Sequence, residues 1–185
     1  MDQNPFNNLQ PSTTEYTDQS YEEITFSNCD FSNSDFTDTL FENCEFVGCN
    51  LSNVTIANSK FQQVTFSQCK LVGLDFSSLS KILLSVGFVD SNLSFCNFSD
   101  LMLKDTKFIG CQLNTCDFMG SNLQGALFEN SSLTDSQFEN CDLSEADFRT
   151  ASGFYFDPWK NKMDKAMFSA HGALNFLSPL NIIIE

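Results

Sequence analysis

Eight cysteines are the first residues in this chain whose chemistry needs an explanation, because thiols form disulfides and bind metal ions. They are Cys29, Cys44, Cys49, Cys69, Cys96, Cys111, Cys116 and Cys141. Their separations are multiples of five apart from one two-residue offset, whereas zinc sites pair cysteines at short spacings and commonly add histidine. The single histidine, His171, lies outside this pattern. The spacing therefore predicts small buried thiols that pack in a repeating structure, with no disulfide, metal or cofactor.

Serine and aspartate are abundant and could in principle act as nucleophile and acid. A nucleophile needs an adjacent base, and residues 21–148 contain no histidine and no lysine in a convincing position. Carboxylate pairs that cleave polysaccharides need a groove, and the chain has no insertion long enough to build one. We therefore expect a protein that is not an enzyme.

A period of five residues organises the chain. Counting from Tyr21, every fifth residue is large and apolar as far as Phe76. The phase then slips by two residues within 77–82, and the count resumes at Leu83 and continues to Phe148. We call these large residues the centre residues. Two positions before each of them lies a column of mostly small residues, the small-residue column, which holds all eight cysteines.

A period of five fits neither an α-helix nor a simple strand. It fits a chain that turns by about 90° every five residues, so that four fives close a square coil and coils stack about 4.8 Å apart. Centre residues and the small-residue column face inward, and the other three positions are polar because they face solvent. The sequence predicts an all-β fold, a right-handed quadrilateral parallel β-helix. Leucine and phenylalanine alternate over residues 83–148, which places leucine on two opposite faces and phenylalanine on the other two.

Three regions follow from this pattern. Residues 1–20 are predicted to be a flexible lead-in, and residues 21–148 form the repeat region, with a bend at 77–82 where Lys81 bulges into solvent. Residues 149–185 combine an irregular segment, a final partial coil, a short capping helix over 170–177 with Ser169 as its N-cap, and an apolar tail. The candidate residues for a lid or a homodimer contact are Phe176, Leu177, Leu180, Ile182, Ile183 and Ile184. Both interpretations stay open, and they are compatible.

The chain is strongly acidic, with 24 acidic and 9 basic residues and a formal net charge of −15. This charge disfavours direct binding to nucleic acid or to an anionic membrane. The sequence contains no run of about 18 apolar residues, so it predicts no membrane span. The polar N-terminal residues do not look like a secretory signal, so we expect a cytoplasmic protein.

Several stretches resemble the A(D/N)LXX pattern of the pentapeptide-repeat family, among them Ala146-Asp147-Phe148, Cys116-Asp117-Phe118, Ser121-Asn122-Leu123 and Cys141-Asp142-Leu143. Within that family the chain is similar to Qnr-type and MfpA-type quinolone-resistance proteins. The resemblance implies a rod that dimerises through its C-terminal end, mimics duplex DNA with an acidic surface, and binds DNA gyrase or topoisomerase IV. The chain differs in lacking the long loops that many Qnr-type proteins carry between coils.

Candidate partner-binding residues are the outward acids Asp30, Asp35, Glu45, Asp75, Asp117, Asp142 and Asp147. Each precedes a centre residue, so each could equally make a hydrogen bond at a corner of the coil. A protein–protein adaptor with a partner unrelated to topoisomerases is the alternative function. A continuous acidic stripe along the rod would favour DNA mimicry, whereas a mixed or apolar face would favour the adaptor.

Overall fold

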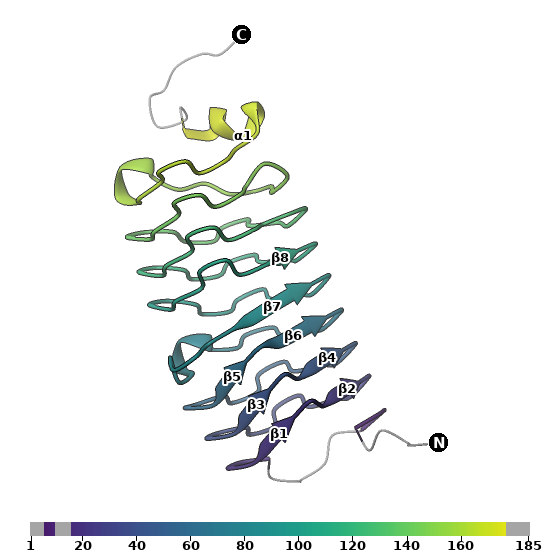
Figure 1. Cartoon of the computed structure of the whole chain (residues 1–185). Helices are drawn as coiled ribbons and strands as arrows, with labels where there is room; N and C mark the ends of the chain where they lie inside the picture. The colour runs from purple at the N-terminus through teal and green to yellow at the C-terminus, as the bar shows by residue number, and fades with distance from the viewer. Residues whose placement is uncertain (1–5, 10–15, 177–185) are drawn as a thin grey trace.

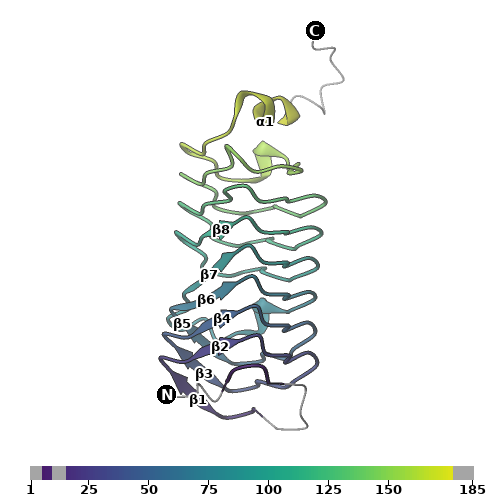
Figure 2. The ribbon, with the colours of Figure 1, turned by 90° about the vertical axis from the view of Figure 1, so that its right-hand side faces the viewer.

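The chain forms a right-handed rod of stacked square coils (Figures 1 and 2), and the computed structural model describes residues 6–9 and 16–176. On one side of the rod, the short strands β1 (Ser20–Glu22), β3 (Leu40–Glu42) and β5 (Lys60–Gln62) pair in parallel. The next side carries β2 (Thr25–Ser27), β4 (Glu45–Val47), β6 (Val64–Ser67), β7 (Val86–Val89) and β8 (Phe108–Ile109), also parallel and in that order. The predicted β-helix is confirmed.

The register shows that each coil takes twenty residues. Phe26 lies opposite Phe46, which lies opposite Phe66. Phe66 lies opposite Phe88 because the phase slip adds two residues to that coil. Single parallel bridges, such as Asp30 to Asn50 and Asp117 to Gln137, continue the stacking on the other two sides.

Four faces of the rod can thus be named by their centre residues. The first face contains Phe41, Phe61, Leu103, Leu123 and Leu143, and the second contains Phe26, Phe46, Phe66, Phe88, Phe108, Phe128 and Phe148. The third contains Phe31, Leu51, Leu71, Leu93, Leu113 and Leu133, and the fourth contains Phe36, Ile56, Phe76, Phe98, Phe118 and Phe138.

The corners between faces explain much of the polar sequence. The residue two positions after a centre residue adopts a left-handed backbone, as in Asn28 at φ 51°, Asp38 at φ 59° and Asn140 at φ 59°. Asparagine, aspartate and glycine tolerate this conformation better than other residues, because a Cβ normally clashes there. Many polar residues of the repeat therefore serve the backbone.

Stacked aromatic rings fill the core. Phe108 and Phe128 lie 5.1 Å apart at 3°, and Phe128 and Phe148 lie 4.7 Å apart at 15°. All three side chains are fully buried. Rings of the second and fourth faces meet edge to face, as Phe98 and Phe108 do at 5.8 Å. The predicted separation of leucine and phenylalanine onto alternate faces is confirmed.

The phase slip is a short outward excursion between β6 and β7. It begins with the 3-10 helix η1 (Phe76–Ser78), whose N-cap Asp75 accepts the backbone N–H of Ser77. Lys81 is exposed, as predicted, and its Nζ donates to the carbonyl oxygen of Asp100. The inward position predicted for Leu83 is wrong: this side chain is 72% exposed, and Leu84 packs against the core instead. The excursion therefore extends one residue further along the chain than the periodicity predicts, and the inward positions resume at Leu84.

The N-terminal segment joins the rod earlier than expected. Phe6 contacts Phe26 at a ring distance of 4.8 Å, and Asn7 forms a parallel bridge with Ser27. Tyr16 is buried and contacts the ring of Phe36 at 5.3 Å. The described residues 6–9 and 16–20 of the predicted lead-in therefore cover the apolar end of the first complete coil.

Aromatic side chains of the C-terminal segment cover the apolar end of the last coil. Phe154 and Phe156 are buried, and Phe168 stacks on Phe148 at 5.3 Å, so the predicted final partial coil is present. A 3-10 helix, η2 (Pro158–Lys160), occupies the corner that η1 occupies lower in the rod, and both lie on the same side in Figure 1.

The last described element is the short helix α1 (Ala170–Leu174). Ser169 is its N-cap as predicted, but the helix ends earlier than the expected residue 177. Phe176 contacts the ring of Phe168 at 5.0 Å and so takes part in closing the core. The other candidate lid or dimer residues, from Leu177 onward, lie outside the described residues. No helix in the part of the chain that the structure describes is long and apolar enough to span a membrane.

Candidate protein-binding surface

The predicted partner-binding acids have a structural role at the corners. Six of the seven accept the backbone N–H of the residue two positions on, as Asp35 does from Thr37 at 2.9 Å and Asp117 from Met119 at 2.8 Å. The other four are Asp30, Asp75, Asp142 and Asp147. Asn50, Asn92, Asn97 and Asn122 make the same bond. The turn requires the carbonyl-type oxygen and does not require the charge.

The structure does not bring these seven acids onto one surface. Asp142 lies on the first face, Glu45 and Asp147 on the second, and Asp30 on the third. Asp35, Asp75 and Asp117 lie on the fourth face, on alternate coils. Glu45 and Asp147 also share a column, but they lie at opposite ends of it, whereas these three recur on every second coil.

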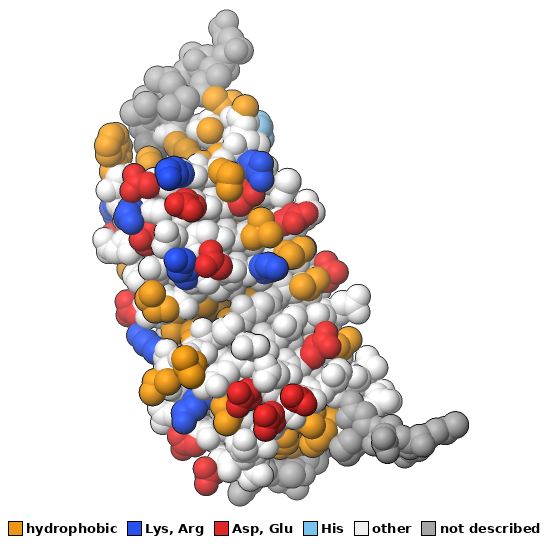
Figure 3. Space-filling model, in the orientation of Figure 1, with side chains coloured by type: hydrophobic (Ala, Val, Ile, Leu, Met, Phe, Trp, Pro, Cys, Tyr) orange, Lys and Arg blue, Asp and Glu red, His pale blue; other side chains and the backbone are white. Residues whose placement is uncertain are grey.

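Three of the acids off the fourth face are compensated by neighbours. Asp147 pairs with Arg149 at 2.7 Å, and hydrogen bonds from that arginine lower the pKa of the carboxyl. Hydrogen bonds from Ser144 and, more weakly, from Lys162 lower the pKa of Asp142. The pKa of Asp30 is lowered mainly by hydrogen bonds from Ser32. On the side shown in Figure 3, Lys and Arg side chains are interspersed with the acids.

The fourth face carries acids without basic residues among them. We include its two corners, which gives the described residues 32–38, 52–58, 72–78, 94–100, 114–120 and 134–140, and call this surface the acidic face. Its charged residues are Asp35, Asp38, Asp75, Asp100, Asp117, Asp135 and Glu139. Two lysines reach its edges: Lys81 donates to the backbone of Asp100, and Lys160 pairs with Glu139 at 3.1 Å. Sequence reasoning missed Asp38, Asp100, Asp135 and Glu139, which share this face through the twenty-residue coil.

The charge density of this face can be compared with that of DNA. Six coils at about 4.8 Å span about 29 Å, so seven carboxylates give about one charge per 4 Å. A single DNA strand carries about one charge per 3.4 Å, and the duplex carries about one per 1.7 Å. The acidic face therefore approaches the charge density of one strand of a duplex.

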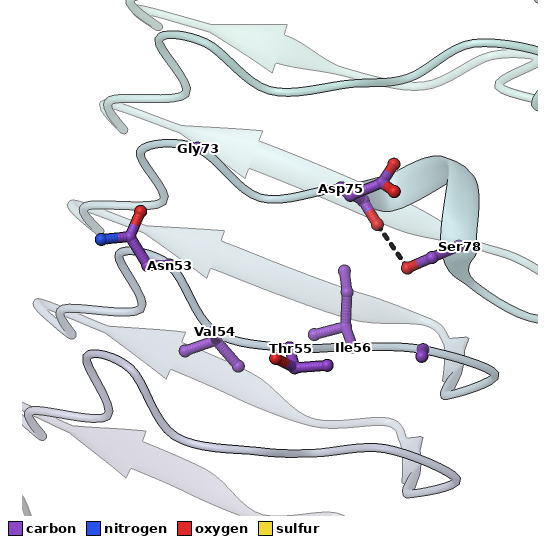
Figure 4. A pocket seen from close by; sticks show the side chains of 8 residues that line it. Asn53, Val54, Thr55, Ile56, Gly73, Asp75 and Ser78 are labelled. Atoms are coloured by element: carbon purple, nitrogen blue, oxygen red, sulfur yellow. Dashed lines mark hydrogen bonds between the residues drawn. The ribbon is translucent and has the colours of Figure 1, made fainter.

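A shallow hollow interrupts the acidic face beside Asp75. Bridges join Asp35 to Thr55 and Asp75 to Asn97, but within the described residues none joins Thr55 to Asp75. The hollow has a volume of about 380 Å³ and is lined by Asn53, Val54, Thr55, Ile56, Ala57, Gly73, Asp75 and Ser78. Figure 4 shows Ser78 donating to the carbonyl oxygen of Asp75, over 2.6 Å, above the coil that carries Thr55. The coils separate here because η1 draws the chain away from the ladder.

No thiol is exposed on this surface. All eight cysteines are free and buried. Burial raises the pKa of Cys111 to about 11 and that of Cys116 to about 12. Among the described residues there is no group of three or more His, Cys, Asp or Glu that could hold a metal ion.

Solved structures of known proteins share the fold of this chain. The chain is similar in structure to a trypsin-treated variant of QnrB1, a plasmid-mediated fluoroquinolone resistance protein, with 20% identity over 96% of this chain and 98% of that chain and a TM-score of 0.67. Full-length QnrB1 gives 19% identity over 94% and 95% of the two chains and a TM-score of 0.57. No curated protein matches the chain.

The repeat itself identifies the family. The model of the pentapeptide repeat region matches residues 20–81 and 66–138, which together cover more than half of the chain. These matches span the phase slip and the described coils on both sides of it. The chain belongs to the pentapeptide repeat family.

Proposed function

We propose that this chain is a non-catalytic binding protein whose acidic face occupies the basic DNA-binding surface of a type II topoisomerase, DNA gyrase or topoisomerase IV. In doing so it would protect the enzyme from quinolones. The observation that carries the proposal is the run of seven carboxylates along one face, of which, within the described residues, only Glu139 pairs with a basic side chain. The negative potential of these carboxylates attracts the basic DNA-binding surface of the enzyme and speeds the association of the two proteins.

Two further observations support this choice of partner. The rod has the fold of QnrB1, which is described as a fluoroquinolone resistance protein. The carboxylates of Asp35 and Asp117 accept hydrogen bonds from the turn backbone, which holds them in place before a partner arrives. A preorganised row of charges loses less entropy on binding than flexible side chains would.

A second copy of the chain is the other partner that we propose, through the C-terminal end. Tyr155 is 56% exposed and Trp159 is 95% exposed at this end of the rod. Large exposed aromatic side chains mark contact surfaces. Light scattering of the purified protein tests this point, with Trp159→Ser as the variant expected to shift the mass towards that of a monomer.

The topoisomerase proposal is tested with two matched triple variants. The first carries Asp35→Asn, Asp75→Asn and Asp117→Asn, which removes three charges from the acidic face. The second carries Asp30→Asn, Asp142→Asn and Asp147→Asn, which removes three charges from the other faces. Asparagine makes the same turn hydrogen bond at Asn50 and Asn97, so both variants should keep the fold.

The measurement is supercoiling by DNA gyrase, and decatenation by topoisomerase IV, with and without a fluoroquinolone. We expect the wild type to inhibit the enzyme or relieve the drug, the first variant to lose this effect, and the second to retain it. Equal loss in both variants would show that overall charge matters and the face does not. No effect of the wild type at micromolar concentration on either enzyme would exclude the topoisomerase proposal. The alternative function, a protein–protein adaptor with an unrelated partner, would then remain.

A further inference from the structure

Large exposed apolar side chains lie in two regions of the rod. One is the C-terminal end. The other lies just above the phase slip and contains Ile82, Leu83, Phe95, Met102 and Met119. We call these five residues the apolar belt. Figure 3 shows part of this region as apolar side chains at the edge of the rod beside the position of η1 in Figure 1.

Two residues of the belt stand where the backbone disfavours them. Phe95 has φ 64° and Leu83 has φ 57°, both in the left-handed region. They are the only apolar residues among the described non-glycine positions with positive φ, which are otherwise Asn, Asp, Gln, Glu, Thr and Lys. Phe95 is 63% exposed, so packing within the chain does not explain its presence. Strain combined with exposure is typical of a functional contact.

The belt lies at both edges of the acidic face. Phe95 stands at the corner between the third and fourth faces, and Met119 stands at the corner between the fourth and first faces. Asn97 and Asp117 lie between them on adjacent coils, joined by a parallel bridge. Ile82, Leu83 and Met102 extend the apolar surface onto the first face, where Lys81 and Lys104 are the neighbouring cations and Glu42 and Asp105 the neighbouring acids.

We propose that the apolar belt and the acidic face form one docking surface for a basic, amphipathic segment of a partner protein. This proposal rests on the proposed function, because it uses the same acidic face. It adds that the partner inserts apolar side chains beside Phe95 and Met119 while its lysines or arginines meet Asp75, Asp100 and Asp117. Charge complementarity selects a basic segment, and a few desolvated apolar anchors carry most of the energy of such an interface.

The probes are two 18-residue synthetic peptides of equal positive charge, one with leucine and lysine in an amphipathic helical pattern and one with serine in place of leucine. The reporter is Phe95→Trp in a Trp159→Phe background. Trp159 is the single tryptophan of the chain, so the new residue is then the only indole. The leucine–lysine peptide should shift its emission to the blue, and the serine–lysine peptide should leave it unchanged.

Affinities are then compared in the unlabelled protein. The wild type should bind the leucine–lysine peptide about tenfold more tightly than the serine–lysine peptide. The variant Phe95→Asn/Met119→Asn should lose this preference. It should unfold no more easily than the wild type, since asparagine suits the corner of Phe95. Met167→Asn, which changes a methionine at the C-terminal end of the rod that is about as exposed as Met119, should keep the preference. Equal affinities of the wild type for the two peptides, or a preference that survives in the double variant, would overturn the proposal.

The gyrase assay separates this proposal from the proposed function. If gyrase inhibition depends on Asp35, Asp75 and Asp117 but is unchanged in Phe95→Asn/Met119→Asn, the DNA-mimic proposal holds and the apolar belt is not part of the surface. If the wild type has no effect on gyrase or topoisomerase IV but shows the peptide preference and the emission shift, the docking surface holds and its partner is a different basic protein.

Discussion

The thiol of Cys49 donates a hydrogen bond to the backbone carbonyl oxygen of Phe26, in the coil below, over 3.3 Å. Cys69 makes the same bond to Phe46, and Ser131 makes it to Phe108. In the last coil Asn161 makes it to Phe138. The small-residue column is therefore also a column of hydrogen-bond donors to the backbone carbonyl groups of the coil below.

Replacing Ser131 by alanine should destabilise the rod. The Ser131 hydroxyl donates to the carbonyl of Phe108 and accepts the N–H of Cys111, both at 2.9 Å. Alanine fits the space but leaves two buried backbone groups unpaired, which costs about 1–3 kcal/mol. Urea unfolding of Ser131→Ala measures this loss.

Ser131→Cys is the matched variant, because a thiol fills this role at Cys49 and Cys69. We expect it to unfold close to the wild-type midpoint, as should Ser99→Ala at an outward position. Equal midpoints for Ser131→Ala and Ser131→Cys would show that size alone determines which residues suit the column.

Phe128 tests the ring stack. Its ring lies between those of Phe108 and Phe148 and is fully buried. Phe128→Ala should lower the free energy of unfolding by about 3–5 kcal/mol through lost burial and a cavity. Phe95→Ala, which truncates an exposed ring, should change it by less than about 0.5 kcal/mol. A small loss at Phe128 would mean that the neighbouring rings close the gap.

Much of the fold follows from the sequence because each repeat imposes the same inward and outward pattern. The apolar residue at every fifth position predicts the core, and the strict alternation of leucine and phenylalanine predicts the stack that contains Phe128. The grouping of Asp35, Asp75 and Asp117 was also open to prediction. Their separations of 40 and 42 residues are two coils each, once the slip is counted.

The details of the slip could not be predicted in this way. Two extra residues can be absorbed by several backbone routes of similar energy, and periodicity does not choose between Leu83 and Leu84 as the inward residue. The opening between Thr55 and Asp75 depends on η1, which forms where the repeat pattern is absent. The exposure of Phe95 could have been predicted, because it is an apolar residue at a corner position where asparagine, aspartate and glycine predominate.

The buried thiols should be unreactive in the folded protein. Burial raises the pKa of Cys111 to about 11 and that of Cys116 to about 12, so neither forms thiolate at pH 8. Titration with a thiol reagent at pH 8 should find almost no reactive cysteine in the native protein, and all eight after denaturation in urea without reductant. Fewer than eight after denaturation would reveal a disulfide, and rapid native labelling would show that the coils open locally.

The free energy of unfolding should decrease as the pH is lowered, and part of this decrease should depend on Asp142 and Asp147. Their pKa values are lowered in the folded protein, by Ser144 and Lys162 for Asp142 and by Arg149 for Asp147. The unfolded chain therefore binds protons at a higher pH than the folded chain does. The stabilisation is fully present above the unfolded pKa of about 3.9 and is lost as the pH falls through the folded values. Urea midpoints of the wild type and Asp142→Asn/Asp147→Asn, measured from pH 7 to pH 3, test this.

The double variant should be less stable than the wild type at pH 7, and the gap should narrow below about pH 3.9 as the wild-type carboxylates become protonated. Asparagine keeps the turn hydrogen bond at both positions, as Asn122 shows, so the gap reports charge. Because the pairs with Lys162 and Arg149 are partly exposed, salt at about 0.5 M should also reduce the gap at pH 7. A gap that stays the same at every pH and salt concentration would mean that the carboxylates act only as hydrogen-bond acceptors.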